Sequence, residues 1–174
     1  TGTGGIVGGP TSNMVIGGTS NFGTLTFSGT NQLLNLTLNR TSAGLVTLGG
    51  DLTILGTFTQ TDGDLSLNGF TFQLSGGYSL TSGNITSAVN SSRLIVDGAG
   101  PLPLTGVGFG TGSTFNTITL DRASATFNTS SSVTVTNLNL LDGTFNNTGA
   151  VSIAGTITRE AGTLSNTVVP SATS

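Results

Sequence analysis

The sequence lacks the residue types that carry most enzyme chemistry and most recognition of charge. It has no histidine, cysteine, tryptophan or lysine, and charged residues make up only 6% of its 174 positions, against roughly a quarter in ordinary globular domains. Without cysteine there is no disulfide and no indication of a redox compartment. With four arginines, seven acidic residues and a net charge of −3, binding to nucleic acid or to an anionic membrane is not expected.

Long apolar runs are also missing. No stretch approaches the roughly 18 apolar residues of a membrane-spanning helix, and the opening TGTGG has no charged and apolar leader of the kind found in signal peptides. Because the chain does not begin with methionine, we expect a processed form or an excerpt. The apolar residues are patterned and charge is scarce, which argues against disorder.

Glycine, threonine, serine and asparagine replace the missing charges, with glycine alone at 28 positions. Apolar residues alternate with these polar ones over short stretches, as in FTFQL at 70–74, ITL at 118–120 and VTV at 133–135. Alternation with a period of two predicts strands with one buried face. Helix signals are poor throughout, since glycine and β-branched residues are frequent.

Glycines recur at a spacing that indicates a coil. Gly44, Gly63 and Gly83 follow one another after 19 and 20 residues, and Gly143 and Gly162 repeat the spacing of 19. Apolar residues stand at matching offsets from these glycines, for example Val46, Leu65, Ile85, Phe145 and Leu164. The pattern predicts an all-β parallel β-helix (β-solenoid) with coils of about 20 residues, expected to be right-handed, in which like residues stack along the interior.

A longer repeat overlies the short one. SNMVIGG at 12–18 resembles SRLIVDG at 92–98, and LNLTLNRTSA at 34–43 resembles FNTITLDRASA at 115–125, which makes Arg40 and Arg122 equivalents. We therefore predict one solenoid domain over residues 1–174, built of two units at about 12–91 and 92–171. The alternative, two β-sandwich modules of about 80 residues, does not account for the period of 19–20.

Two Gly- and Pro-rich segments, near 2–20 and 99–113, interrupt the pattern. Proline cannot donate a backbone hydrogen bond to a ladder, so both are predicted to be loops or bends. The ends of such a rod would carry unpaired strand edges that need caps or partners.

The acidic residues offer candidate sites. The pairs Asp62-Gly63, Asp97-Gly98 and Asp142-Gly143 predict tight turns, where glycine adopts positive φ and aspartate bonds the local backbone; the alternative is calcium binding at Asp62 and Asp64. A polysaccharide-acting enzyme would need acids of neighbouring coils to converge in a groove. The acids are scattered along the sequence, at Asp51, Asp62, Asp64, Asp97, Asp121, Asp142 and Glu160.

The arginines and threonines have structural and functional interpretations. Arg40, Arg122 and Arg159 are expected to form surface ion pairs or contacts with an amide ladder; the alternative for the first two is a sugar-binding or catalytic spot. Thr-x-Thr pairs, as at 57–59 and 117–119, could form an ice-binding face, but threonine is also a common outward residue in strands. Asn-x-Ser/Thr sequons are expected by chance in this composition. No nucleophile–base pair can be assembled, so we predict no enzyme and no catalytic, cofactor-binding or metal-binding residue.

Phrases such as LVTLGGDLTILGTFTQTDGDLSLNG and VTVTNLNLLDGTFNNTGAVSIAGTITREAG resemble the strand repeats of large secreted bacterial surface proteins. These include filamentous-haemagglutinin-like adhesins, autotransporter passengers and repetitive outer proteins of gliding bacteria. The resemblance covers nearly the whole chain and implies a parallel β-helix, an extracellular or cell-surface location and a structural or adhesive role. We expect a subunit or segment of a surface filament that associates with copies of itself, end to end or laterally. The alternative is an adhesin or a carbohydrate- or ice-binding module with glycan partners.

Overall fold

A computed structural model of the chain describes residues 5–41, 44–102, 107–129, 131–165 and 168–170. It is an all-β, parallel β-solenoid of about seven turns, as the 20-residue period predicts. The described residues contain 17 strands and no helix. The strands are β1 (Gly9–Thr19), β2 (Gly23–Leu25), β3 (Gln32–Thr41), β4 (Leu45–Leu48), β5 (Leu52–Ile54), β6 (Thr57–Asp62), β7 (Asp64–Ser66), β8 (Thr71–Leu74), β9 (Gly77–Leu80), β10 (Ile85–Thr86), β11 (Arg93–Asp97), β12 (Thr114–Thr129), β13 (Val133–Asn147), β14 (Val151–Ile153), β15 (Ile157–Arg159), β16 (Thr163–Ser165) and β17 (Val168–Pro170).

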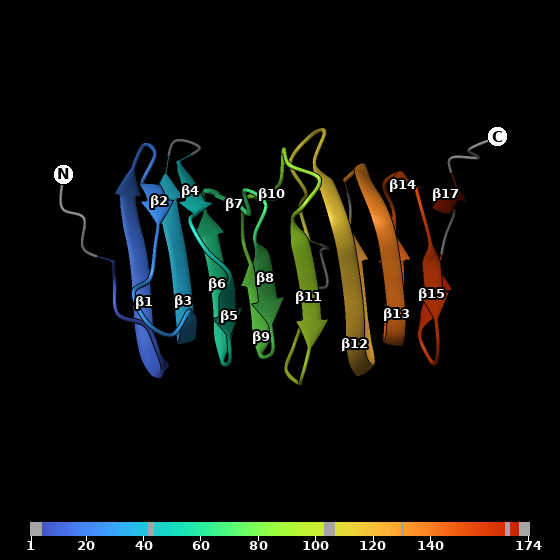
Figure 1. Cartoon of the computed structure of the whole chain (residues 1–174), viewed down its shortest axis with the longest axis horizontal. Helices are drawn as coiled ribbons and strands as arrows, with labels where there is room; N and C mark the ends of the chain where they lie inside the picture. Colours follow the sequence, from blue (N-terminus) through green and yellow to red (C-terminus); the bar gives the residue numbers. More distant parts are fainter. Residues whose placement is uncertain (1–4, 42–43, 103–106, 130, 166–167, 171–174) are drawn as a thin grey trace.

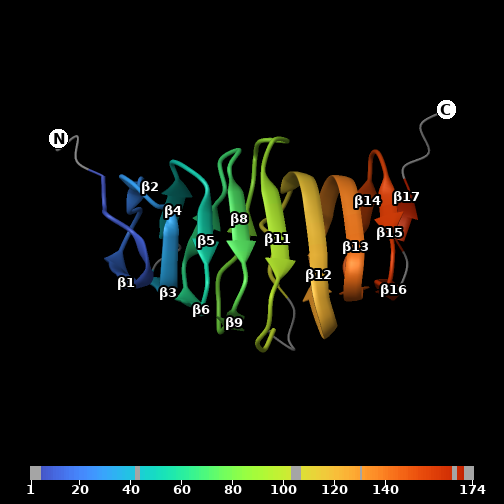
Figure 2. The same ribbon diagram turned by 60° about the horizontal axis from the view of Figure 1, so that its bottom comes forward.

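Each coil runs along one wall of the solenoid and returns along another. In the coil that begins at β5, strands β5 and β6 belong to the 13-stranded sheet, and β7 returns in the 4-stranded sheet β10-β7-β4-β2. Figure 1 shows the strands side by side in a single row from the N-terminus to the C-terminus, and Figure 2 shows the same row turned by 60°. All pairs of neighbouring strands, from β1 to β17, are parallel. Because β11 pairs with β8 on one side and with β12 on the other, the hydrogen-bonded ladder is continuous between the two predicted units.

Apolar columns fill the interior, because residues that pair in register on successive coils stack on one another. One column consists of Leu33, Ile54, Leu74, Val96, Leu120 and Leu140. A parallel column runs through Leu52, Phe72, Leu94, Ile118 and Leu138. Both columns are fully or almost fully buried along their length. Burying one such side chain contributes about 1.5–3 kcal/mol, so these columns are the main source of stability.

Aromatic side chains pack against one another in the core at two places. The ring of Phe58 stacks on Tyr78 with 5.0 Å between centroids and meets Phe72 edge-on at 5.3 Å. Phe127 stacks on Phe145 at 5.7 Å in the second half of the chain. Most of the aromatic side chains are therefore committed to packing between successive coils.

Glycine turns the chain at the corners that the sequence repeat marks. Gly63 has φ of +92° and Gly143 has φ of +83°, a conformation that residues with a side chain rarely adopt. A Cβ atom on Gly63 would lie 2.7 Å from the carbonyl oxygen of Gly44 and 2.8 Å from Cβ of Arg40. Both the turn and the close approach of neighbouring coils therefore require glycine here.

The predicted loop near 2–20 is wrong for most of its length. Residues Gly9–Thr19 form β1, which pairs in parallel with β3, whereas residues 1–4 lie outside the described part of the chain. Pro10 fits because β1 is the edge strand of the sheet, where a missing donor is tolerated. Pairing with β3 outweighs the loop preference of the local sequence.

The segment near 99–113, predicted to be a loop, contains no strand among its described residues, but two of them make isolated bridges to neighbouring coils. Val107 and Phe109 are buried, and they extend the wall of the 4-stranded sheet through bridges from Ile85 to Phe109 and from Val107 to Thr129. Residues 103–106 of this prediction lie outside the described part of the chain. The segment therefore contributes a short stretch of wall to its coil.

Candidate functional site

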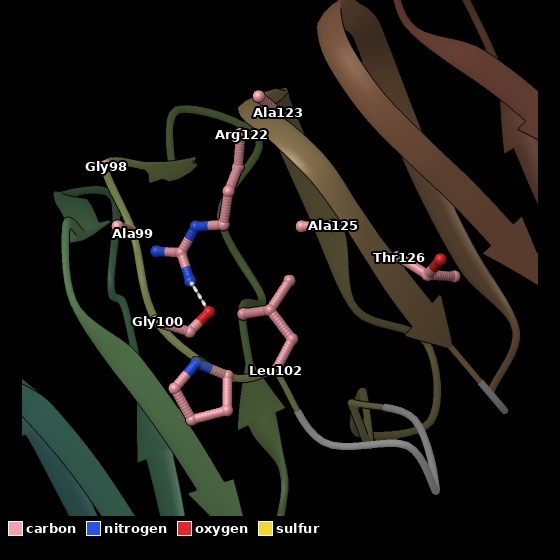
Figure 3. A pocket seen from close by; sticks show the side chains of 9 residues that line it. Gly98, Ala99, Gly100, Leu102, Arg122, Ala123, Ala125 and Thr126 are labelled. Atoms are coloured by element: carbon pink, nitrogen blue, oxygen red, sulfur yellow. Dashed lines mark hydrogen bonds between the residues drawn. The ribbon is translucent and has the colours of Figure 1, made fainter.

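A recess lies beside β12. It has a volume of about 630 Å³ and is lined by Gly98, Ala99, Gly100, Pro101, Leu102, Arg122, Ala123, Ala125 and Thr126. Figure 3 shows the guanidinium of Arg122 pointing toward Gly100, with Leu102 and Ala125 beside it. Arg122 is the only charged side chain in this lining, so its bonding decides what the recess can do.

Arg122 is buried and bonded to backbone carbonyls. Its Nε donates to the Asp97 carbonyl at 2.9 Å, Nη1 to Gly100 at 3.1 Å, and Nη2 to Leu74 and Gly76 at 2.9 and 2.7 Å. Burial lowers the pKa of the Arg122 guanidinium, and the Asp97 carboxylate partly offsets that effect. Charge-assisted bonds of this kind are about twice as strong as neutral ones, so Arg122 fastens its coil to the two before it.

Arg40, the counterpart of Arg122 one unit earlier, also bonds to backbone carbonyls, but only to those of the coil directly before it. Its Nε donates to the Ser20 carbonyl at 2.9 Å and Nη1 to Gly17 at 2.5 Å, while Nη2 donates to Thr19 and Ser20. Of the two predicted roles, the surface ion pair is wrong for Arg40 and Arg122, since both side chains are buried and donate to backbone carbonyls of neighbouring coils. The sequence repeat correctly identified the two arginines as equivalents, but it did not predict the backbone carbonyls to which they bind.

Arg159 differs from the other two. Its Nε donates to the Gly162 carbonyl at 2.7 Å, and the residue is exposed. This hydrogen bond lies within its own coil, whereas the sequence predicted a surface ion pair or a contact with an amide ladder. Arg159 stacks on Leu140 at the end of an otherwise apolar column, which puts it at the C-terminal end of the rod.

At all three Asp-Gly pairs the glycine has positive φ, as predicted, and at two of them the aspartate bonds the local backbone. Oδ1 of Asp62 accepts the N–H of Gly63 at 2.8 Å, and Oδ1 of Asp142 accepts that of Gly143 at 2.6 Å. Asp97 instead accepts a hydrogen bond from Nε2 of Gln73 at 2.6 Å, one coil away. Asp64 accepts bonds from the backbone and side-chain amides of Asn84 at 2.8 and 3.1 Å, so it too has a structural role.

Three of the acids that are scattered in sequence stand together in the fold. Asp97, Asp121 and Asp142 are successive partners in register on β11, β12 and β13. Oδ1 of Asp97 is buried without a hydrogen-bond partner. Within the described ranges, no group of three or more His, Cys, Asp or Glu side chains is arranged to hold a metal ion.

The Thr-x-Thr pairs do not stack on one another. Thr117 and Thr119 pair with Asn137 and Asn139 on one side and with Arg93 and Ile95 on the other. Thr57 and Thr59 pair with Gly77 and Ser79 on one side, and on the other side Thr59 pairs with Thr37. A regular threonine array of the kind that an ice-binding face needs is not formed by these pairs.

Two of the sequon asparagines, Asn39 and Asn90, are exposed. Asn35 is half-buried and accepts the backbone N–H of Thr57 at 2.6 Å. Side-chain amides also bond along the rod, as where Nδ2 of Asn139 donates to Oγ1 of Thr119 at 3.4 Å. The outward asparagines therefore belong in part to ladders that tie neighbouring coils together.

The two ends of the rod differ from its sides. At the N-terminal end β1 pairs with β3 alone, and at the C-terminal end β15 and β16 each pair with β13 alone. Among the large apolar residues exposed in the described chain, five lie in the first or last coil and two, Leu55 and Val89, lie between them; the five are Ile6, Val7, Val15, Phe22 and Ile157. Unpaired edges with apolar neighbours are sites where further strands can add.

Comparison of the chain with protein-family models, with curated proteins and with solved structures found no match. The described residues contain no helix long and apolar enough to cross a membrane. The case for function therefore depends on the geometry of the rod and its ends.

Proposed function

We propose that this chain is an extracellular structural protein, a subunit or segment of a surface fibre that assembles through stacking of β-solenoids. The observation that carries the proposal is the pair of open strand edges, β1 at one end and β15 with β16 at the other, on a rod whose strands are all parallel. A head-to-tail contact between such ends does not close on itself and generates an open filament.

The composition supports this role. A surface of hydroxyls and amides with few charges repels copies of itself weakly. The resemblance to secreted bacterial surface repeats supports a location outside the cell. We propose the surface or the medium as the site of action and copies of the same chain as the principal partner.

We extend the proposal to a non-catalytic role, which the lining of the recess beside β12 supports. The recess contains one charged side chain, Arg122, which bonds to four carbonyl groups. General acid–base catalysis needs a titratable group within hydrogen-bond reach of the reacting atom. The lining residues of the recess supply no carboxylate for that purpose.

Electron microscopy of negatively stained protein at neutral pH tests the proposal. We expect long thin fibres whose abundance rises with protein concentration. Short single rods at every concentration would contradict self-assembly and would favour the alternative, a binding module within a larger surface protein. Glycan arrays and ice-recrystallisation assays on the same sample then test that alternative.

A further inference from the structure

The middle of the chain contains a junction between its two repeated units. There β11 lies along β8 in parallel, with Leu94 paired with Phe72 and Val96 with Leu74. All four side chains are fully buried. The backbone N–H of Arg93 donates to the carbonyl of Phe70 at 3.1 Å. The N–H of Arg93 therefore points from β11 toward the coil that contains β8.

Both surfaces of this junction recur at the ends of the rod. The segment SNMVIGG that contains β1 matches SRLIVDG around β11, so Met14 and Ile16 correspond to Leu94 and Val96. At the other end Val151 and Ile153 of β14 hold the repeat positions of Phe72 and Leu74. The chain thus has a β11-like strand at one end and a β8-like strand at the other.

We propose that two copies join head to tail, with β1 of one copy lying in parallel along β14 of the other, Met14 on Val151 and Ile16 on Ile153. In the single chain β17 holds this place, through three paired residues. The second copy displaces β17 and repeats the junction that β8 and β11 form internally. The inference rests on the proposed fibre function and names its contact and register.

The exposed residues at the two ends agree with this contact. Ile157 is 41% exposed, whereas Tyr78, at the equivalent position of the repeat, is 2% exposed beneath the coil that follows it. Val15 on β1 is 73% exposed. The first 39 residues contain no charged side chain, so β1 lacks the charges that commonly protect an edge strand from pairing.

Substitutions at the two ends test the contact. In a parallel ladder alternate residues direct their N–H groups to the same neighbour, so Val15, the counterpart of Ile95, has its N–H at the free edge of β1. Val15→Pro removes that donor, and an edge strand tolerates proline there. Ile157→Asp places a charge at the opposite end, and Val89→Asp is the matched control, since Val89 is 43% exposed in the middle of the rod.

Sedimentation velocity and light scattering measure the outcome. We expect the unaltered chain and V89D to form long oligomers, and V15P and I157D each to lose them. Because each end variant keeps one competent end, an equal mixture of V15P and I157D should form dimers and stop there. Homodimers of either variant alone would show a like-to-like contact and overturn the inference.

The outcomes also separate this inference from the proposed function. If V15P and I157D assemble as the unaltered chain does, the contact is wrong while fibre formation stands. If the unaltered chain stays monomeric, both are wrong. Thermal unfolding verifies that each variant is folded, and I157D carries the test alone if V15P is not.

Engineered cysteines test the register, because the chain has none of its own. Ile95 pairs with Gln73 in the internal junction, so Val15 should pair with Ser152. A mixture of V15C and S152C chains should form a disulfide-linked dimer on oxidation. A mixture of V15C and A150C should not, because a shift of two residues, about 6.6 Å, moves the Cα atoms beyond bridging distance. Equal cross-linking of both pairs, or of neither, overturns the register.

Discussion

The hydroxyl of Tyr78 donates to Oε1 of Gln60 at 2.6 Å inside the solenoid, where both side chains are buried. The amide of Gln60 in turn donates to the Gly63 carbonyl at 2.6 Å and to the Asn84 carbonyl at 3.2 Å. The pair therefore links the aromatic core to the glycine corner of its own coil and to the coil that follows.

Removing the hydroxyl should destabilise the fold without changing its shape. Tyr78→Phe leaves Oε1 of Gln60 buried without its donor, which costs about 1–3 kcal/mol. Chemical denaturation measures the free energy of unfolding, with Ser79→Ala as the control because Ser79 is exposed on the same strand. A loss below about 0.5 kcal/mol in Y78F, equal to a typical surface substitution, would contradict this role.

The same hydroxyl predicts a loss of stability at high pH. Burial raises the pKa of Tyr78 well above its usual range, so in the unfolded chain the phenol ionises first, near pH 10. Stability is then fully present below about pH 10 and falls by up to about 1.4 kcal/mol per pH unit above it. Denaturation at several pH values checks this, and Y78F should lack that part of the slope. Tyr78 is the only tyrosine, so tyrosinate absorbance reports its titration directly.

We expect substitution of a buried arginine to reduce stability more than substitution of an exposed one. Arg122→Met would leave the carbonyls of Leu74, Gly76 and Gly100 without this donor, and several unsatisfied groups at about 1–3 kcal/mol each would cost more than about 3 kcal/mol in total. Arg93→Met, on the exposed side of β11, should change stability by no more than about 0.5 kcal/mol. Thermal and chemical unfolding of both variants test the difference, and similar losses would refute the fastening role of Arg122.

Alanine substitutions at two glycines with nearly the same backbone conformation distinguish the cost of backbone strain from the cost of steric crowding between coils. Gly63 and Gly23 have φ of +92° and +94°, but a Cβ on Gly23 would meet nothing within 4 Å, whereas one on Gly63 would lie 2.7 Å from a carbonyl oxygen. Gly23→Ala should cost about 1–2 kcal/mol from conformation alone, and Gly63→Ala distinctly more. If both variants lose the same free energy of unfolding, the neighbouring coil moves to accommodate the added Cβ atom at Gly63, which would contradict the prediction.

The repeat in the sequence was sufficient to predict the solenoid. Side chains two residues apart share a face in a strand, and the spacing of 19–20 aligns columns such as Phe72 with Leu52. The loop predicted near residues 2–20 was wrong because strand pairing outweighed local composition. Glycine and proline near residues 9–19 indicate a loop, but β3 pairs with most of that segment.

The buried arginines could not be predicted from local pattern. A charged residue in a polar chain indicates the surface, and the carbonyl groups that bind Arg122 come from residues 22 to 48 positions earlier. The column of Asp97, Asp121 and Asp142 was missed for a related reason, since its register includes coils longer than 20 residues.

Electron microscopy of the unaltered chain tests the central claim most directly. About seven turns spaced about 4.8 Å apart predict fibres with an axial repeat of roughly 30–40 Å. Such fibres, lost in I157D and retained in V89D, would support a structural protein built by end-to-end stacking. Isolated rods of that length at every concentration would contradict it.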